Sequence, residues 1–456
     1  MSEEEKVQKA RRILEEYIGD TSTEEFSTAY IAKQLGRIKK NDDEEFYSYL
    51  KRLCDEDLGD IVIEFPDYIL KDVLEHIPTL KLVSAIEELE SDDATDLIQD
   101  IDDIDHEKAQ EVLENLDEKD KEEIIKLISY DEDEAGAYMQ AESFVGKMNE
   151  KISQAVKRLR KLKIEGELEN IHQLFIVDPK GKLLYGISLE DLITFDFDMT
   201  FKQIIQSQSK GFYTPILAND HDDIQKIVTL FDEHNLSVLP IVDEENTLVG
   251  RITSDDIHDI IQENATEQIY NLAGVDDEAE EEYTLFEIGR TRALWLFLNL
   301  LTAIVASVVI SIFDATIQAY VALAVLMPIV ASMGGNAGTQ TLTVVVRKLA
   351  LGEINFENAK EALSKEVIVS TLNGFFFALI MGFVAFFWFK QPLLGLVIAL
   401  SMIVNLFFAG FFGALIPLGL KKMNIDPAVG STVLLTTITD VVGFFSFLGL
   451  ASWILI

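Results

Sequence analysis

The sequence has very few of the residues that build reactive centres. It contains one cysteine, Cys54, and six histidines among 456 residues. A single cysteine forms no intramolecular disulfide and excludes a metal site built from several cysteines. The histidines are scattered, no nucleophile stands beside a base, and neither a Walker A string nor a phosphorylated-ATPase signature occurs. An enzyme or an ATP-driven pump is therefore the least expected class.

Basic residues are scarce as well. Lysine and arginine number 38 against 79 aspartates and glutamates, for a net charge of −41. The excess is confined to residues 1–292, with 72 acidic and 31 basic side chains, whereas the rest of the chain has seven of each. Such a surface repels nucleic acid and attracts cations. The N-terminal sequence has no apolar segment, so we expect no cleaved signal peptide and a cytosolic acidic half.

The second half of the chain is apolar. Five segments each exceed the ~20 residues that cross a ~30 Å apolar core, and they span 293–313, 317–346, 367–389, 393–420 and 428–456. Of the basic residues near their ends, eight lie on one side and only Lys390 on the other. Because basic residues favour the cytoplasm, we predict a multi-pass protein of the cell membrane. Its N-terminus is cytoplasmic and its C-terminus lies outside.

Two features of the apolar half predict a pore. The glycine-rich string Gly334 to Gly338 interrupts the second segment, so we expect a broken helix, which is tolerated in lipid only where it is buried or lines water. Asp440 lies twelve residues into the last segment, about 18 Å deep. A carboxylate there costs roughly 2.5–3.5 kcal/mol unless it faces water or a cation. The alternative is a neutral carboxyl, or one bonded to nearby threonines, with a structural role.

The types of ligand in the apolar half limit which ions the pore could bind. The apolar half has no cysteine and no histidine, which argues against copper or zinc held directly. Carboxylate, amide, hydroxyl and carbonyl oxygens remain. One carboxylate is too few for a dehydrated Ca²⁺ cage but suits Mg²⁺, which keeps its water. Potassium stays possible from ligand type alone.

The acidic half has its own organisation. Short units recur between residues 60 and 129, each about one helix, and stacked they make a superhelix; many of their carboxylates are explained as helix caps. A strand–turn–strand–helix pattern then occurs twice, 65 residues apart, near Val177 and Val242. This repeat resembles a tandem pair of CBS domains. The resemblance implies a site for an adenine nucleotide such as ATP at Ser188 with Asp191 and at Thr253 with Asp256, and simple helix caps are the alternative.

The expected fold is therefore multi-domain and mainly α. It has an α-superhelical N domain, two α/β CBS domains, a long connecting helix and five transmembrane helices. The expected boundaries, in that order and with an acidic linker before the membrane, are 1–137, 138–204, 205–254, 255–274, 275–292 and 293–456.

At this point several motifs together resemble one family. Met333 to Gln340, Arg347, Asp426 to Ala428 and Thr437 to Asp440, with the order of the domains, are similar to the MgtE family of magnesium transporters over essentially the whole chain. The resemblance implies a homodimer with a pore between its membrane halves, lined by the second and fifth segments. It also implies that Asp440 receives hydrated Mg²⁺. The residues implied beside it are Asn336, Gly334, Gly335, Thr339 and Thr436.

The resemblance also implies that the helix at 255–272 locks the pore from the cytoplasm. Where family members often carry acidic residues, this chain has Asn235, Asn264 and Gln268, which leaves the regulatory sites with fewer carboxylates. Those that remain repel one another, and Mg²⁺ between them would favour a packed, closed state by mass action. The candidate Mg²⁺ ligands besides Asp440 are Asp93, Asp96, Asp223, Asp256, Asp259, Glu263, Glu267, Asp314 and Asp426.

The hypothesis is passive import of Mg²⁺ under negative feedback. The membrane potential suffices, because two charges moving down 100 mV release about 4.6 kcal/mol. One alternative is a cation transporter of broader selectivity, for Co²⁺, Ni²⁺ or Ca²⁺. The other is a membrane-anchored sensor in which the CBS pair reads nucleotides and the apolar segments only anchor.

Overall fold

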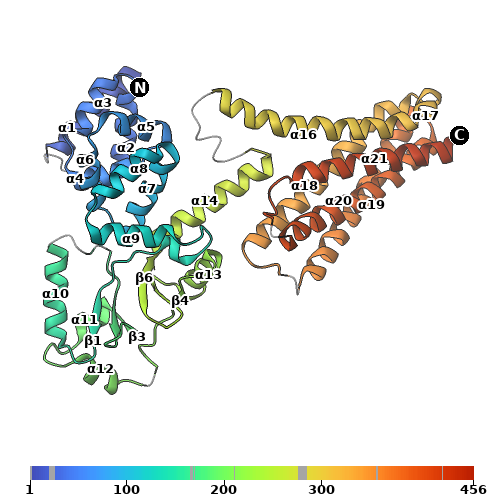
Figure 1. Cartoon of the computed structure of the whole chain (residues 1–456). Helices are drawn as coiled ribbons and strands as arrows, with labels where there is room; N and C mark the ends of the chain where they lie inside the picture. The colour runs from blue at the N-terminus through green and yellow to red at the C-terminus, as the bar shows by residue number, and fades with distance from the viewer. Residues whose placement is uncertain are drawn as a thin grey trace. The chain divides into compact units, whose positions relative to one another are not determined.

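The computed structural model describes residues 3–19, 26–164, 168, 170–209, 211–275, 285–355, 358–423 and 425–456. They divide into two units, Met1–Gln262 and Glu263–Ile456. The first unit begins with the predicted stack of short helices (Figure 1). Their bounds are α1 Glu3–Ile18, α2 Thr28–Lys39, α3 Asp43–Leu50, α4 Asp55–Ile63, α5 Asp67–His76, α6 Thr79–Glu87, α7 Ser91–Ile104, α8 His106–Asn115 and α9 Glu118–Ile128.

The sequence explains where these helices begin. Pro66 and Pro78 are the N-cap residues of α5 and α6, and the carboxylate of Asp105 caps α8 by accepting the amide N–H of Lys108. Helices two apart in the chain pack together: α4 with α6, α6 with α8, α5 with α7, and α7 with α9. Their apolar sides join in one core, so the superhelix predicted from the repeated units is confirmed.

The two copies of the strand repeat fold alike. After a 3-10 turn, η1 (Ala135–Tyr138), the first copy comprises β1 (Val145–Lys147), α10 (Ile152–Ile164), β2 (Gln173–Val177), β3 (Leu183–Ser188), α11 (Leu189–Thr194) and α12 (Phe201–Ser207). The second comprises β4 (Ala218–Asn219), α13 (Ile224–His234), β5 (Val238–Val242), β6 (Leu248–Thr253) and the first turns of α14 (Ser254–Ala273). In each sheet the middle strand pairs parallel with the first and antiparallel with the third.

The second unit contains the apolar helices. They are α16 (Leu285–Ile312), the short α17 (Asp314–Ala319), α18 (Ala322–Ala350), α19 (Ala359–Phe389), α20 (Pro392–Lys422) and α21 (Ser431–Leu455). All except α17 are long and apolar enough to cross a membrane. Residues 276–284 of the predicted acidic linker lie outside the described residues, and its last residues, 285–292, already belong to α16. The second long apolar helix starts at Ala322 rather than at 317, because residues 317–319 belong to the short helix α17.

Helix α20 is the centre of this bundle. It packs against α18, α19 and α21, which run beside it in Figure 1. Glycines permit the close contacts: a Cβ on Gly395 would lie 2.7 Å from the carbonyl oxygen of Gly382, and one on Gly413 would lie 2.8 Å from that of Gly338. Small residues let helix backbones approach each other in lipid, where burial of apolar side chains gives no driving force.

The predicted break in the second apolar segment is wrong. Helix α18 runs from Ala322 to Ala350 without interruption, with Pro328 inside it. Its glycines serve contact with neighbouring helices instead: a Cβ on Gly334 would lie 2.3 Å from the amide nitrogen of Asn405, and one on Gly338 would lie 3.1 Å from Leu435. A continuous helix satisfies its own backbone hydrogen bonds, which the apolar core of a membrane demands.

Candidate functional site: the Asp440 region and the acidic clusters

Asp440 is a half-buried carboxylate in the middle of α21. It makes no hydrogen bond or ion pair with any residue that the structure describes. The neighbouring threonines do not serve it, because their hydroxyls donate to carbonyls of their own helix: Thr436 to Thr432 at 2.9 Å and Thr437 to Val433 at 2.6 Å. The carboxylate is therefore available to a ligand from outside this bundle.

A polar stripe runs along the exposed side of α18. Ser332, Asn336 and Gln340 stand four residues apart, so they share one face of the helix, and all three are exposed. The amide of Asn336 donates to the hydroxyl of Ser332 at 3.2 Å, and a Cβ on Gly335 would meet nothing within 4 Å. Polar groups on the outside of a spanning helix are unfavourable against lipid. This stripe therefore requires a cover of protein or water.

The other predicted pore residues take different positions. Gly334 is buried against α20 and does not reach the exposed stripe. Thr339 on α18 and Thr436 on α21 are partly exposed. Asp314 lies in the first turn of α17 and accepts a hydrogen bond from the amide of Gln318 at 2.7 Å.

The C-terminal end of α14 is attached to the ends of α18 and α21. The hydroxyl of Thr432 donates to the carbonyl of Leu272 at 2.8 Å, and Leu272 packs against an apolar cluster that includes Leu342 and Leu435. The amide of Asn271 donates to two carboxylates, Glu267 at 3.2 Å and Asp426 at 3.1 Å. The structure thus brings two of the predicted ligands, Glu267 and Asp426, to one amide.

A second acidic cluster forms where α7 meets the start of α14. Of the predicted ligands, Asp93 faces Asp256 and Asp259 closely enough for repulsion, and Asp60 and Asp255 add to it. Burial, and after it repulsion by these neighbouring carboxylates, raises the pKa of Asp93 to about 6. Part of the Asp93 side chain is exposed, so water screens some of this repulsion. Burial also raises the pKa of Asp256, against the hydrogen bonds that Thr253 donates.

Asp92 and Arg251 belong to this cluster and were not among the predicted site residues. Asp92 is 8% exposed, and its Oδ1 atom is buried without a hydrogen-bond partner among the described residues. Burial and the nearby carboxylates hold its pKa well above the usual range. Arg251, on β6 and 2% exposed, pairs with Glu90 at 3.2 Å and donates to the carbonyl of Asn170 at 3.0 Å. No sequence pattern marks either residue, since their partners are far away in the chain.

The remaining predicted ligands lie at other places on the described part of the chain. Asp96 lies exposed on α7, and Glu263 lies exposed on α14. Asp223 is the N-cap of α13, where it accepts the amide N–H of Gln225 at 2.7 Å. Within the described residues, no three acidic, histidine or cysteine side chains stand close enough to hold one metal ion directly.

The predicted nucleotide residues make local hydrogen bonds at the starts of α11 and α14. The hydroxyl of Ser188 caps α11 by accepting the amide N–H of Asp191 at 3.0 Å. Thr253 is fully buried, and its amide and hydroxyl both donate to Asp256 at 2.9 Å. The Ser188 contact favours the helix-cap interpretation, whereas Thr253 is the donor to Asp256. Nucleotide binding stays a prediction at both positions.

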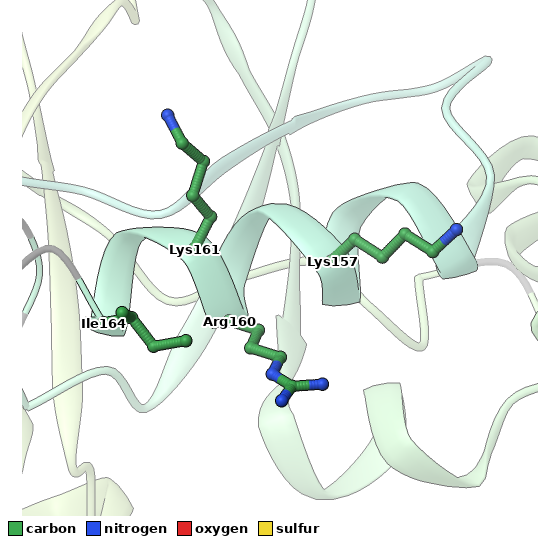
Figure 2. A pocket seen from close by; sticks show the side chains of 4 residues that line it. All are labelled: Lys157, Arg160, Lys161 and Ile164. Atoms are coloured by element: carbon green, nitrogen blue, oxygen red, sulfur yellow. The ribbon is translucent and has the colours of Figure 1, made fainter.

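A basic face on α10 is the exception to the acidic surface. Figure 2 shows the side chains that line a hollow there, and they point in different directions. All four come from α10 alone: Lys157, Arg160, Lys161 and Ile164. Basic residues near a helix C-terminus are favoured by its dipole, so this face has a local structural explanation.

Comparison with known sequences gives matches along most of the chain. Residues 27–133 match the family described as the MgtE intracellular N domain, residues 213–263 the CBS domain, and residues 327–450 a divalent cation transporter family. A magnesium transporter of Thermus thermophilus is 32% identical over 73% of this chain and 72% of its own length. A magnesium transporter of Bacillus subtilis is 28% identical over 89% of this chain and 87% of its own.

Among solved structures, the cytosolic domain of an Mg²⁺ channel in complex with ATP matches with a TM-score of 0.48 and 26% identity. It covers 56% of this chain and 98% of its own.

Proposed function

Because this chain belongs to the MgtE family of magnesium transporters, which are transporters and not enzymes, we propose that it conducts hydrated Mg²⁺ along a path beside α18 and α21. The observation that carries this proposal is Asp440, a carboxylate in a spanning helix without a partner among the described residues. A buried charge of this kind is unfavourable unless a cation or water balances it. A permeating Mg²⁺ ion supplies that balance and leaves again.

The path is formed between two copies of the chain. Support comes from the polar stripe of Ser332, Asn336 and Gln340, which the described residues of the second unit leave exposed. A symmetric dimer would place two such stripes on either side of one aqueous path and remove them from lipid. The carboxylates of Asp440 from both copies would then act on the same ion.

Selectivity follows from the hydration of the ion. The groups that the proposal assigns to the path are hydroxyls, amides and one carboxylate per chain, too few to replace the shell of a dehydrated ion. Mg²⁺ dehydrates reluctantly and is bound through its waters, whereas Ca²⁺ prefers six to eight protein oxygens. The flux is passive: two charges moving down about 100 mV release about 4.6 kcal/mol.

Cytosolic Mg²⁺ closes the path. Support for a cation at the cluster of α7 and α14 comes from Asp92, whose buried Oδ1 has no partner among the described residues. Burial, and then repulsion between neighbouring carboxylates, raises the pKa of Asp92 and Asp93. Mg²⁺ held through its own waters by Asp92, Asp93 and Asp256 would make this packing favourable by mass action. Helix α14 starts in this cluster and ends at Leu272, against α18 and α21. Loss of Mg²⁺ therefore loosens one end of a helix whose other end sits at the membrane helices.

The arrangement in the membrane follows from the same proposal. The N-terminal unit faces the cytoplasm and the C-terminus lies outside, as the basic residues at the ends of the helices predict. The domain boundaries expected from the sequence belong to the proposal as well, with the connecting helix at 255–274 and the membrane domain at 293–456.

The decisive experiment is Mg²⁺ uptake into liposomes. Asp440→Asn should lower the flux about tenfold or more, because it removes the charge but keeps the size of the side chain. Glu361→Gln removes an exposed charge from the first turn of α19 and should leave the flux unchanged. Wild-type flux through Asp440→Asn and Asp440→Ala would show that the pore assignment is wrong. Competition by Ca²⁺, Co²⁺ and Ni²⁺ in the same liposomes tests the broader-selectivity alternative.

Gating has its own test, limited proteolysis of the full chain with and without millimolar Mg²⁺. Wild-type protein should be protected by Mg²⁺, and Asp93→Asn with Asp256→Asn should need less of it, since neutral side chains no longer repel. Equal cleavage of the wild type in both conditions contradicts the feedback proposal but leaves the pore assignment standing.

A further inference from the structure

Asn405 is a fully buried amide at the centre of the membrane bundle. It lies on α20 with 0% of its surface exposed, and its Nδ2 atom donates to the carbonyl of Val330 on α18 at 2.8 Å. Its Oδ1 atom is buried and has no hydrogen-bond partner among the described residues. A leucine would fill the same space without leaving a buried acceptor unpaired, which is unfavourable. The amide therefore needs an explanation beyond the filling of space.

Two glycines from different helices admit this side chain. A Cβ on Gly334 of α18 would lie 2.3 Å from Nδ2 of Asn405, and a Cβ on Gly443 of α21 would lie 2.9 Å from the same atom. Both separations are shorter than any ordinary contact. A side chain at either position would push on the Asn405 amide, so this one amide of α20 contacts both α18 and α21.

The contact lies beside the proposed ion path. Gly334 precedes Asn336 by two residues, and Gly443 follows Asp440 by three. At ~1.5 Å of rise per residue, both path residues lie within about one helical turn of the amide. A change in the Asn405 contact therefore moves the backbone of α18 relative to that of α21 at the depth of the carboxylate.

We propose that Asn405 is a positioning residue for ion selection. It sets the separation between α18 and α21, and so the distance between the Asn336 region and the Asp440 carboxylate. A hydrated ion is selected by the width of the site that receives it, so this separation decides how well Mg²⁺ is preferred to a larger divalent ion. The inference rests on the proposed function, since it assigns a role at the same path.

The test compares ion preference rather than total activity. Asn405→Leu and Asn405→Ala are reconstituted in liposomes as folded protein, and the ratio of Ca²⁺ to Mg²⁺ flux is measured. Ser401→Ala is the matched control, because Ser401 is equally buried on α20 and its hydroxyl donates within its own helix, to Ile398. We expect the ratio to change about fivefold or more in the Asn405 variants, the factor that corresponds to one neutral hydrogen bond, and to stay unchanged in the control.

A packing role alone would give a different result. The melting temperature would fall in the Asn405 variants while the flux ratio stayed at the wild-type value, and this outcome overturns the proposal. Gly443→Ala tests the contact from α21 if the Asn405 variants do not fold. The added methyl group at Gly443 would lie farther from the Asn405 amide than one at Gly334. An unchanged ratio of Ca²⁺ to Mg²⁺ flux in Gly443→Ala also overturns the proposal. Full Mg²⁺ flux through Asp440→Ala would instead refute the proposed function itself.

Discussion

Removal of Arg251 should open the contact between β6 and α7. Its guanidinium is 2% exposed and pairs with Glu90, whose side chain is 19% exposed. Loss of one partner of a buried pair leaves the other charge buried and costs about 3–5 kcal/mol. Arg52 is the matched control. It contacts both carboxylate oxygens of Glu15 at 2.7 and 2.8 Å, but the two side chains are 44% and 52% exposed, so its loss should cost at most about 1 kcal/mol.

Hydrogen exchange followed by mass spectrometry on the full chain separates the two cases. A loss of about 3 kcal/mol raises the exchange of peptides from β6 and α7 about a hundredfold or more when exchange reports local opening. Arg251→Met should show this increase, and Arg52→Met should show almost none at α1 and α3. Arg251→Met combined with Glu90→Gln should recover much of the protection, because no buried charge remains. If Arg251→Met and Arg52→Met raised hydrogen exchange by equally small factors, burial of an ion pair would not matter more than its short distances, and the reasoning would be refuted.

Three further predictions concern stability. Burial raises the pKa of Glu90 to about 7. Above that pH the ionised carboxylate therefore destabilises the packed state by up to about 3 kcal/mol. This cost falls as the pH is lowered toward the usual pKa of a glutamate. The melting temperature of metal-free protein should therefore rise as pH falls from about 8 to about 6, and Glu90→Gln should flatten this dependence. Gly334→Ala should lower the melting temperature through a clash that costs about 1–3 kcal/mol, whereas Gly419→Ala, with nothing within 4 Å of its Cβ, should not. Asp223→Ala should destabilise α13 by about 0.5–2 kcal/mol through loss of its cap, which hydrogen exchange of that helix measures. Because Asp223 caps its own helix, the Mg²⁺ concentration that protects the chain from proteolysis should stay unchanged.

Local patterns predicted the elements well. The five apolar segments follow from hydropathy alone, and the two strand repeats follow from matching residues 65 apart. Even an irregularity repeats, because the pairing shifts at Ile176–Val177 in one sheet and at Ile241–Val242 in the other. These features depend on residues that are close in sequence, which is why composition and periodicity reveal them.

The contacts between distant residues could not be predicted. Arg251 and Glu90 are 161 residues apart, and Asn405 and Val330 are 75 apart. The glycines of α18 show the difficulty: their low helix propensity suggested a break, but the sequence does not say that Gly334 faces Asn405. The sequence also does not tell which carboxylates are capping residues and which are buried together. Asp223 caps its own helix, whereas Asp92 is buried among other acidic side chains.

The two ends of α14 differ in how their carboxylates are balanced, and this difference bears on where the proposed Mg²⁺ sensor lies. At the C-terminal end, the neutral amide of Asn271 donates to both Glu267 and Asp426, and apolar packing of Leu272 adds to the attachment. That junction holds without a cation. At the N-terminal end, Asp92 keeps an unpaired oxygen and Asp93 and Asp256 repel each other, so donors are too few for the acceptors present. Because an ion changes an equilibrium only by its different affinity for the two states, Mg²⁺ acts most strongly where the packed state lacks donors. The proposal therefore puts the sensing at Asp92, Asp93 and Asp256, and takes the Asn271 junction as the fixed attachment of α14 to α21.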